Sequence, residues 1–170
     1  MFMEDRKKRD APTGKYARGH HFLTMKKIFF RSLVLSITFF SAYSHELPIL
    51  EAARTGDLAF IKEKVRSGSK ANQMDPETGE TALMAATQAG NSQIVNLLLE
   101  KGADPNKTLY ENGETALMIA AEAGNKDIVR SLLNKGAKRH LKNWETNETA
   151  LNMANKADHK EIVDILAEKS

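Results

Sequence analysis

The chain has 170 residues, which is room for one domain or a few stacked repeats and argues against a two-domain enzyme. Residues 1–24 carry 6 basic and 3 acidic groups, residues 25–44 carry 3 basic and none acidic, and the remainder carries 16 basic and 19 acidic groups. The part able to fold is therefore acidic despite the formal net charge of +3, which argues against nucleic-acid binding. The absence of cysteine excludes disulfides, thiol catalysis and Cys-ligated zinc.

The first 24 residues contain the basic run Arg6-Lys7-Lys8-Arg9 and almost no apolar periodicity. We interpret residues 1–24 as a disordered extension or as the product of an upstream start codon assigned in error. A nuclear address is disfavoured because a hydrophobic segment follows directly.

Residues 25–44 have the three parts of a secretory signal peptide. Met25-Lys26-Lys27 is a basic start, Ile28 to Phe40 is mostly apolar, and the small residues Ala42 and Ser44 have the spacing that a signal peptidase reads. We predict cleavage between Ser44 and His45, and a periplasmic or secreted product. The apolar stretch is shorter than the roughly 20 residues of a membrane-spanning helix, so a membrane anchor formed by the uncleaved leader is the weaker alternative.

A repeat of 34 residues organises residues 45–170. Thr81-Ala82-Leu83-Met84 recurs as Thr115-Ala116-Leu117-Met118 and again as Thr149-Ala150-Leu151-Asn152. The same offset relates Ile61 to an apolar residue in each later unit, which gives four units at about 46–74, 75–108, 109–142 and 143–170. No unit is long enough to bury its apolar stripe alone, so neighbouring units must stack.

The pattern of each unit predicts two short helices followed by an extended finger. Thr81 is a suitable N-cap for the first helix, and Gly90 supplies the left-handed residue that ends it. Asn91 caps a second helix with apolar residues at 3.6-residue spacing, and Gly102 ends that helix. The polar stretch 106–114 contains Asn-Gly and predicts a short β-hairpin.

At these residues the chain resembles the ankyrin repeat. The matching pieces are Ala120-Ala121-Glu122-Ala123-Gly124, Ile94-Val95-Asn96-Leu97-Leu98-Leu99 and Gly102-Ala103-Asp104-Pro105-Asn106. The resemblance covers about residues 46–170 and implies an all-α ankyrin-repeat solenoid of four helix-turn-helix units with short β-hairpin fingers. It also implies a protein-binding function through the finger tips and the concave face of the first helices.

The chain departs from the family pattern in ways that affect stacking. The family's His, which ties neighbouring repeats by hydrogen bonds, is replaced by Met84, Met118 and Asn152. We therefore expect apolar packing to carry more of the stacking energy. Asp158 replaces the turn glycine of the last unit, where left-handed backbone costs roughly 1 kcal/mol more than for Gly.

The sequence offers no group of residues suited to catalysis or to holding a cofactor. It has no Gly-rich phosphate loop, nucleophile elbow or Ser-His-Asp arrangement. The five histidines are dispersed without the spacing of metal ligands. We expect a protein that is not an enzyme, has no metal, cofactor or small-molecule substrate, and is a monomer.

The three finger tips carry the strongest candidate binding residues. Their sequences, Pro76-Glu77-Thr78-Gly79-Glu80, Tyr110-Glu111-Asn112-Gly113-Glu114 and Trp144-Glu145-Thr146-Asn147-Glu148, fall in register. One interpretation is a partner-binding edge with Tyr110 and Trp144 as anchors and two columns of glutamate that select a basic surface. The other is that the rings brace neighbouring fingers and that Glu80, Glu114 and Glu148 favour the positive ends of the helices that follow.

The first-helix face is the second candidate surface. Met84, Met118 and Glu122 fall on or near it, and methionine suits an adaptable contact. Filling of the core is an equally good interpretation of both methionines.

Together these observations predict a non-catalytic protein-interaction module of the cell envelope, with an unidentified protein as its partner. A membrane-tethered scaffold and a secreted effector that binds a protein outside the cell are the alternatives.

Overall fold

The computed structural model describes residues 47–66 and 69–168. The extension, the leader and the predicted cleavage site between Ser44 and His45 lie outside these ranges. The chain divides into two units, Met1–Ser44 and His45–Ser170, and all the described helices belong to the second.

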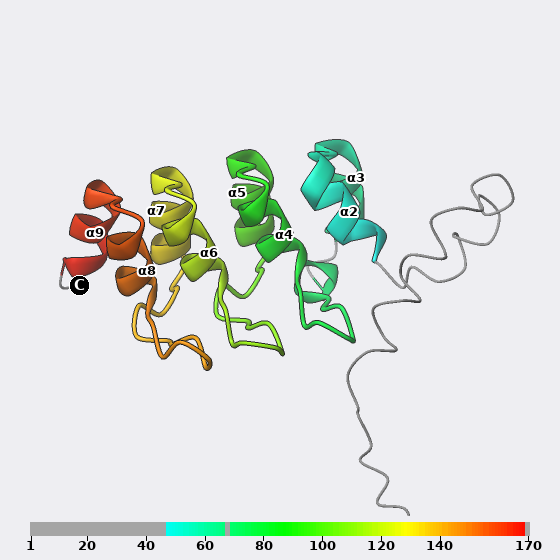
Figure 1. The fold of residues 1–170 in the computed structure, drawn as a ribbon. Helices are drawn as coiled ribbons and strands as arrows, with labels where there is room; N and C mark the ends of the chain where they lie inside the picture. The colour runs from blue at the N-terminus through cyan, green and yellow to red at the C-terminus, as the bar shows by residue number, and fades with distance from the viewer. Residues whose placement is uncertain (1–46, 67–68, 169–170) are drawn as a thin grey trace, which may run out of the picture. The chain divides into compact units, whose positions relative to one another are not determined.

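The described residues form eight α-helices and one 3-10 turn. They are α2 (Pro48–Thr55), α3 (Leu58–Lys64), η3 (Ser69–Asn72), α4 (Ala82–Gln88), α5 (Ser92–Glu100), α6 (Ala116–Glu122), α7 (Lys126–Asn134), α8 (Ala150–Lys156) and α9 (Lys160–Ala167). The helices stand as four pairs side by side in chain order, and between successive pairs a finger extends away from the helices (Figure 1). This arrangement confirms the predicted all-α solenoid of four units.

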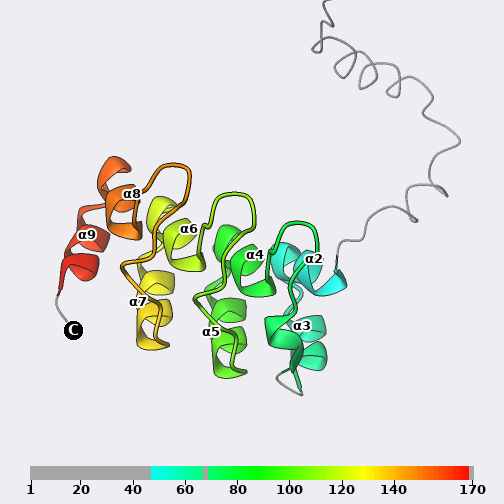
Figure 2. The ribbon, with the colours of Figure 1, turned by 90° about the horizontal axis from the view of Figure 1, so that it is seen from below.

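The helices form two layers. The first helices of the pairs, α2, α4, α6 and α8, pack in one row, and the second helices, α3, α5, α7 and α9, pack in another (Figure 2). The fingers extend from the edge of the first-helix row. A partner that lies along this face therefore meets first helices and fingers together.

Local sequence sets the ends of the helices as predicted. The Thr81 and Thr115 hydroxyls accept hydrogen bonds from the backbone N–H groups three residues on, both at 3.3 Å, and so cap α4 and α6. Asn91 caps α5 through Ile94 N, and Gly90 follows α4 with φ of 69°. Asp158 has φ of 57°, which is the left-handed backbone expected where the other units have Gly.

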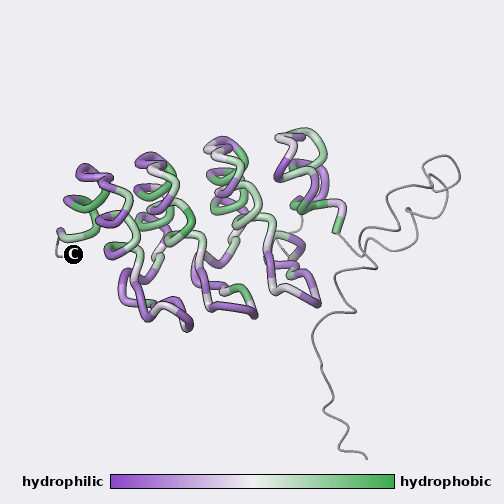
Figure 3. The backbone as a smooth tube through the Cα atoms, in the orientation of Figure 1, coloured by the Kyte–Doolittle hydropathy of each residue, from purple (hydrophilic) through white to green (hydrophobic). Residues whose placement is uncertain are grey.

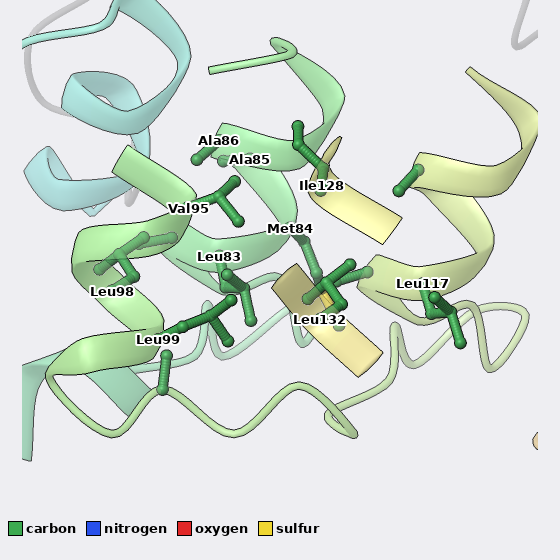
Figure 4. Packing of buried hydrophobic residues seen from close by; sticks show 14 of the residues in the cluster. Leu83, Met84, Ala85, Ala86, Val95, Leu98, Leu99, Leu117, Ile128 and Leu132 are labelled. Carbon is green, nitrogen blue, oxygen red and sulfur yellow. The ribbon is translucent and has the colours of Figure 1, made fainter. Parts of the chain in front are cut away.

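The core lies between the two layers. Apolar residues line the inner sides of the helices, whereas the fingers are mostly hydrophilic (Figure 3). Leu83, Leu98 and Leu132 are 1%, 0% and 0% exposed and belong to one core cluster that runs through neighbouring repeats (Figure 4). Each repeat thus buries its apolar stripe only by contact with its neighbours, as in other repeat architectures.

Hydrogen bonds between repeats are present in addition to this packing. The Asn72 side chain accepts from Asp104 N at 2.7 Å and donates to Gly102 O at 2.8 Å. Asn106 makes the same two bonds to the next exit loop, at 2.8 and 3.1 Å. Asparagines in the exit loops therefore tie neighbouring repeats together by hydrogen bonds that the sequence did not predict, and they act in addition to the apolar packing.

The predicted β-hairpins are the part of the fold that needs correction. Within the described residues each of the first two fingers has a single isolated β-bridge, Met74 with Thr81 and Thr108 with Thr115, and no strand. The tips are too short for a ladder, since Asp75 N already bonds Glu80 O at 2.8 Å across the loop. Of the other tip amides, some bond to side chains or to the neighbouring finger, and Gly79 N and Gly113 N donate to Asp75 O and Leu109 O in their own fingers.

Candidate functional site

In the first and third fingers a polar side chain at the start of the finger fixes the turn, whereas the second finger has Leu109 at this position. Asp75 Oδ1 accepts from Glu77 N at 3.0 Å and from Thr78 N at 2.9 Å, and Asn143 Oδ1 accepts the equivalent pair in the third finger. The hydrogen bond from Thr78 N holds the pKa of the Asp75 carboxyl below its usual value, against the opposing effect of burial. The two side chains make rigid tips that present the residues between them at fixed positions.

Successive fingers are joined in register by one backbone bond each. Tyr110 N donates to Thr78 O at 2.8 Å, and Trp144 N donates to Asn112 O at 2.6 Å. These bonds line up the Tyr and Trp positions of neighbouring fingers, as the repeat period predicts.

Each aromatic ring lies on a glycine of the preceding finger. A methyl group on Gly79 would be 2.7 Å from Tyr110 Cδ1, and one on Gly113 would be 2.5 Å from Trp144 Cε2. Both glycines are buried and have positive φ, 75° and 72°. The rings therefore brace neighbouring fingers, which is one of the two interpretations of the sequence.

The same rings are also widely exposed. Tyr110 is 53% and Trp144 is 64% exposed, and these are the large exposed hydrophobic residues of the described chain. One side of each ring rests on glycine while much of the rest faces solvent. Contact with the preceding finger and contact with a partner are thus compatible.

The outer glutamates Glu77, Glu111 and Glu145 are exposed at the tips, as the sequence predicts. The inner glutamates Glu80, Glu114 and Glu148 are half-buried and each directly precedes the capping threonine of a first helix. This position also agrees with the interpretation that they favour the positive helix ends.

A row of three hollows runs between the fingers and the first helices. The central one, of about 310 Å³, is lined by Glu80, Met84, Gln88, Leu109, Glu114, Ile119, Glu122 and Ala123. Its neighbours, of about 510 and 410 Å³, share Glu80 and Gln88 on one side and Glu114 and Glu122 on the other. We call this row the finger groove; it is acidic along its walls and partly apolar on its floor.

The two end glutamates of the groove are neutralised within the chain. Arg54 Nη2 lies 2.5 Å from Glu80 Oε2, and Lys156 Nζ lies 2.6 Å from Glu148 Oε1. Sequence analysis did not identify either cation, although both stand at the C-terminal part of a first helix, a position that repeats with the period.

The central glutamate differs in its surroundings. Burial, which removes water from the Glu114 carboxylate, raises its pKa, and the nearby negative charge of Glu122 raises it further, while the Asn112 side chain acts in the opposite direction. The surroundings of Glu114 therefore disfavour its charged form, and among the described residues no Lys or Arg pairs with it as Arg54 and Lys156 pair with the end glutamates.

Both methionines that the sequence offered as candidate surface residues are buried. Met84 is 2% and Met118 is 1% exposed, and both belong to the hydrophobic core; Figure 4 shows Met84 among its neighbours. Of the two, only Met84 also reaches the lining of the central hollow. Of the first-helix candidates, Glu122 is exposed and lines the finger groove.

Among the described residues, no three His, Cys, Asp or Glu side chains come together in a way that suits a metal ion. In the same residues no helix is long and apolar enough to cross a membrane.

Comparison with known proteins places this geometry in a family. The family model described as "Ankyrin repeats (3 copies)" matches residues 49–143 and 108–170. The chain belongs to the ankyrin-repeat family. Ankyrin repeats are generally protein–protein interaction modules and are typically not catalytic. No curated protein matches the chain as a relative.

Proposed function

We propose that this ankyrin-repeat protein is a non-catalytic module of the cell envelope that binds a protein partner along its fingers, as a monomer. The observation that carries the proposal is the pair of exposed rings, Tyr110 and Trp144, held in register beside the acidic finger groove. Solvent-exposed Tyr and Trp on rigid supports are the residues that most often dominate interface energetics.

The contacts that hold the rings also suit them to binding. A ring fixed on glycine loses little conformational freedom when a partner covers it, which reduces the entropic cost of association. The outer glutamates beside the rings provide a negative rim that accelerates the approach of a basic partner. The two rings and the outer glutamates would therefore bind the same partner, the rings by apolar contact and the glutamates by charge.

The proposed location is the periplasm or the cell exterior, following cleavage between Ser44 and His45. The three-part leader supports this, and so does the start of the first described helix at Pro48, since loss of residues 1–44 leaves all the described helices whole. Intact-mass analysis of the protein from its native host tests the cleavage. A product that retains Met25, or one confined to the cytoplasm, would contradict export.

Binding is tested by quantitative affinity capture from an envelope extract, with the bound protein identified by mass spectrometry. The double variant Tyr110→Ala, Trp144→Ala should weaken capture by about 2 kcal/mol or more, the scale of interface hot spots. Its urea midpoint should fall only slightly, because each ring contacts the preceding finger on one side and adds little to the buried core of the stack.

The matched control truncates two exposed lysines on or next to the second helices, Lys62→Ala and Lys101→Ala, and should retain full capture. Capture that survives in the Tyr110 and Trp144 variant would contradict a binding edge at the finger tips. A second arm, Glu111→Lys with Glu145→Lys, should slow association and reduce its salt dependence.

A further inference from the structure

One position on the first helices varies in charge from repeat to repeat. The residues that stand there at 34-residue intervals are Arg54, Gln88, Glu122 and Lys156. Each belongs to the last turn of a first helix and lines the finger groove. Each inner glutamate of a finger therefore lies between two of these positions, one from the preceding repeat and one from its own.

At both ends of the groove this position supplies a cation. Arg54 pairs with Glu80 from the preceding repeat, and Lys156 pairs with Glu148 from the same repeat. The groove thus shows two ways in which an inner glutamate binds a guanidinium or an ammonium group.

In the centre neither position supplies one. Glu114 lies between Gln88, the equivalent of Arg54, and Glu122, the equivalent of Lys156. Within residues 47–66 and 69–168, no Lys or Arg forms an ion pair with Glu114. Glu114 and Glu122 share this hollow with Glu80, which Arg54 neutralises. The lining also includes the partly buried apolar side chains Leu109 and Ile119.

We propose, building on the protein-binding function above, that this central hollow receives a Lys or Arg side chain from an extended segment of the partner. The cation lies between Glu114 and Glu122 and takes the place that Arg54 and Lys156 fill at the two ends. Apolar residues flanking that Lys or Arg contact Leu109 and Ile119 on the floor. Charge complementarity selects a basic segment, because among the described residues Arg54 and Lys156 pair with the inner glutamates at the two ends, and no Lys or Arg pairs with Glu114 at the centre.

The groove's form favours an extended protein segment over other ligands. The three hollows are open and continuous, as a chain laid along the fingers requires. No three His, Cys, Asp or Glu side chains of the described residues come together as metal ligands, so the hollow is a poor site for a metal ion. A negative groove also repels the phosphates of nucleic acids.

The test uses the full chain and a blocked peptide, Gly-Leu-Arg-Leu-Gly, together with the same peptide carrying citrulline in place of arginine. Citrulline has the shape of arginine without its charge. Titration followed by Trp144 fluorescence or by NMR should show at least about tenfold tighter binding of the arginine peptide, the effect of one close charge pair in a partly desolvated site.

The decisive variant is Glu122→Lys, which places a cation where Lys156 stands in the last repeat. It should pair with Glu114, remove the preference for the arginine peptide, and leave the melting temperature equal to or above that of the wild type. Gln88→Arg, which copies Arg54, should have the same effect from the other side. Glu100→Lys makes the same change of charge at the exposed end of α5 and should leave the preference intact.

Equal binding of the two peptides by the wild type would overturn the proposal. An equal loss in Glu100→Lys and Glu122→Lys would do the same, because it would show attraction to overall charge and not to this hollow. Failure of this proposal can be told apart from failure of the proposed function. If a partner is captured through Tyr110 and Trp144 but binds Glu122→Lys as well as it binds the wild type, the proposed function stands and only the site for a basic segment is overturned.

Discussion

Leu98 and Leu132 occupy the same position in successive second helices and are both 0% exposed, whereas Tyr110 and Trp144 occupy the same position in successive fingers and are more than half exposed. The helical stack is held by buried apolar surface, each repeat covering the next. The fingers are held by side-chain turns, one backbone bond per neighbour and a ring on a glycine. Stability therefore resides mainly in the stack, and the fingers are free to present exposed rings and poorly compensated charge.

The largest expected effect comes from removing buried surface in the stack. Leu132→Ala in an interior repeat should reduce the free energy of unfolding by roughly 2–5 kcal/mol through lost burial and a cavity between repeats. Lys64→Ala, at the equivalent position of Leu98 in the first repeat, should change it little because Lys64 is only partly buried. Urea unfolding of both variants measures the difference. Equal effects would show that the repeats do not divide into interior units and caps.

The repeat period was sufficient to predict the stack and its helix ends. A recurring Thr-Ala-Leu segment, a left-handed residue and an apolar stripe are local signals, and each has the same physical meaning in every unit. Contacts whose partners differ from unit to unit were not predicted. Arg54 and Lys156 pair with glutamates in opposite directions along the chain, so no single spacing identifies both.

Burial also decides between interpretations of single residues that the sequence leaves open. Methionine suits a core and a surface equally well, and only the position of the side chain between the layers assigns Met84 to the core. The sequence allowed two interpretations of Tyr110 and Trp144, as braces between fingers or as anchors for a partner. The structure supports the first and is compatible with the second, since each ring contacts a glycine and is still more than half exposed.

The next largest effect concerns the hydrogen bonds between repeats. Asn106→Ala removes two bonds to the following exit loop and should cost about 1–2 kcal/mol. His140 occupies the position equivalent to Asn106 in the next repeat and is exposed. His140→Ala is therefore the control and should leave the free energy of unfolding nearly unchanged. Thermal unfolding of both variants tests whether polar bonds add to apolar stacking. A neutral Asn106→Ala would assign the stacking energy to the apolar core alone.

A third comparison separates backbone strain from ring contact. Gly113→Ala and Gly136→Ala both force Ala into left-handed backbone, at φ of 72° and 85°, which costs roughly 1 kcal/mol in each. At Gly113 the added methyl meets the ring of Trp144, whereas at Gly136 no atom of the described residues lies within 4 Å of it. Gly113→Ala should therefore also shift the Trp144 emission spectrum, and Gly136→Ala should leave it unchanged. Identical spectra would mean that the ring does not rest on Gly113 in solution.

The smallest expected effect has the opposite sign and tests the centre of the finger groove. Glu114→Gln should increase the free energy of unfolding at pH 7 by a few tenths of a kcal/mol, the size of partly exposed charge effects, because it removes a half-buried charge next to Glu122. Since folding raises the pKa of Glu114, the destabilisation by its charge is present above that raised pKa. It disappears as the pH falls below the ordinary value of 4.5, where the carboxyl is protonated in both states. Urea melts at pH 7 and pH 3.5 should therefore show the gain only at pH 7.

Glu148→Gln is the matched control and should lower stability slightly, because it breaks the ion pair with Lys156. A loss of stability in Glu114→Gln like that in Glu148→Gln would show that the central carboxylate is compensated in solution, and the two ends and the centre of the groove would then be alike.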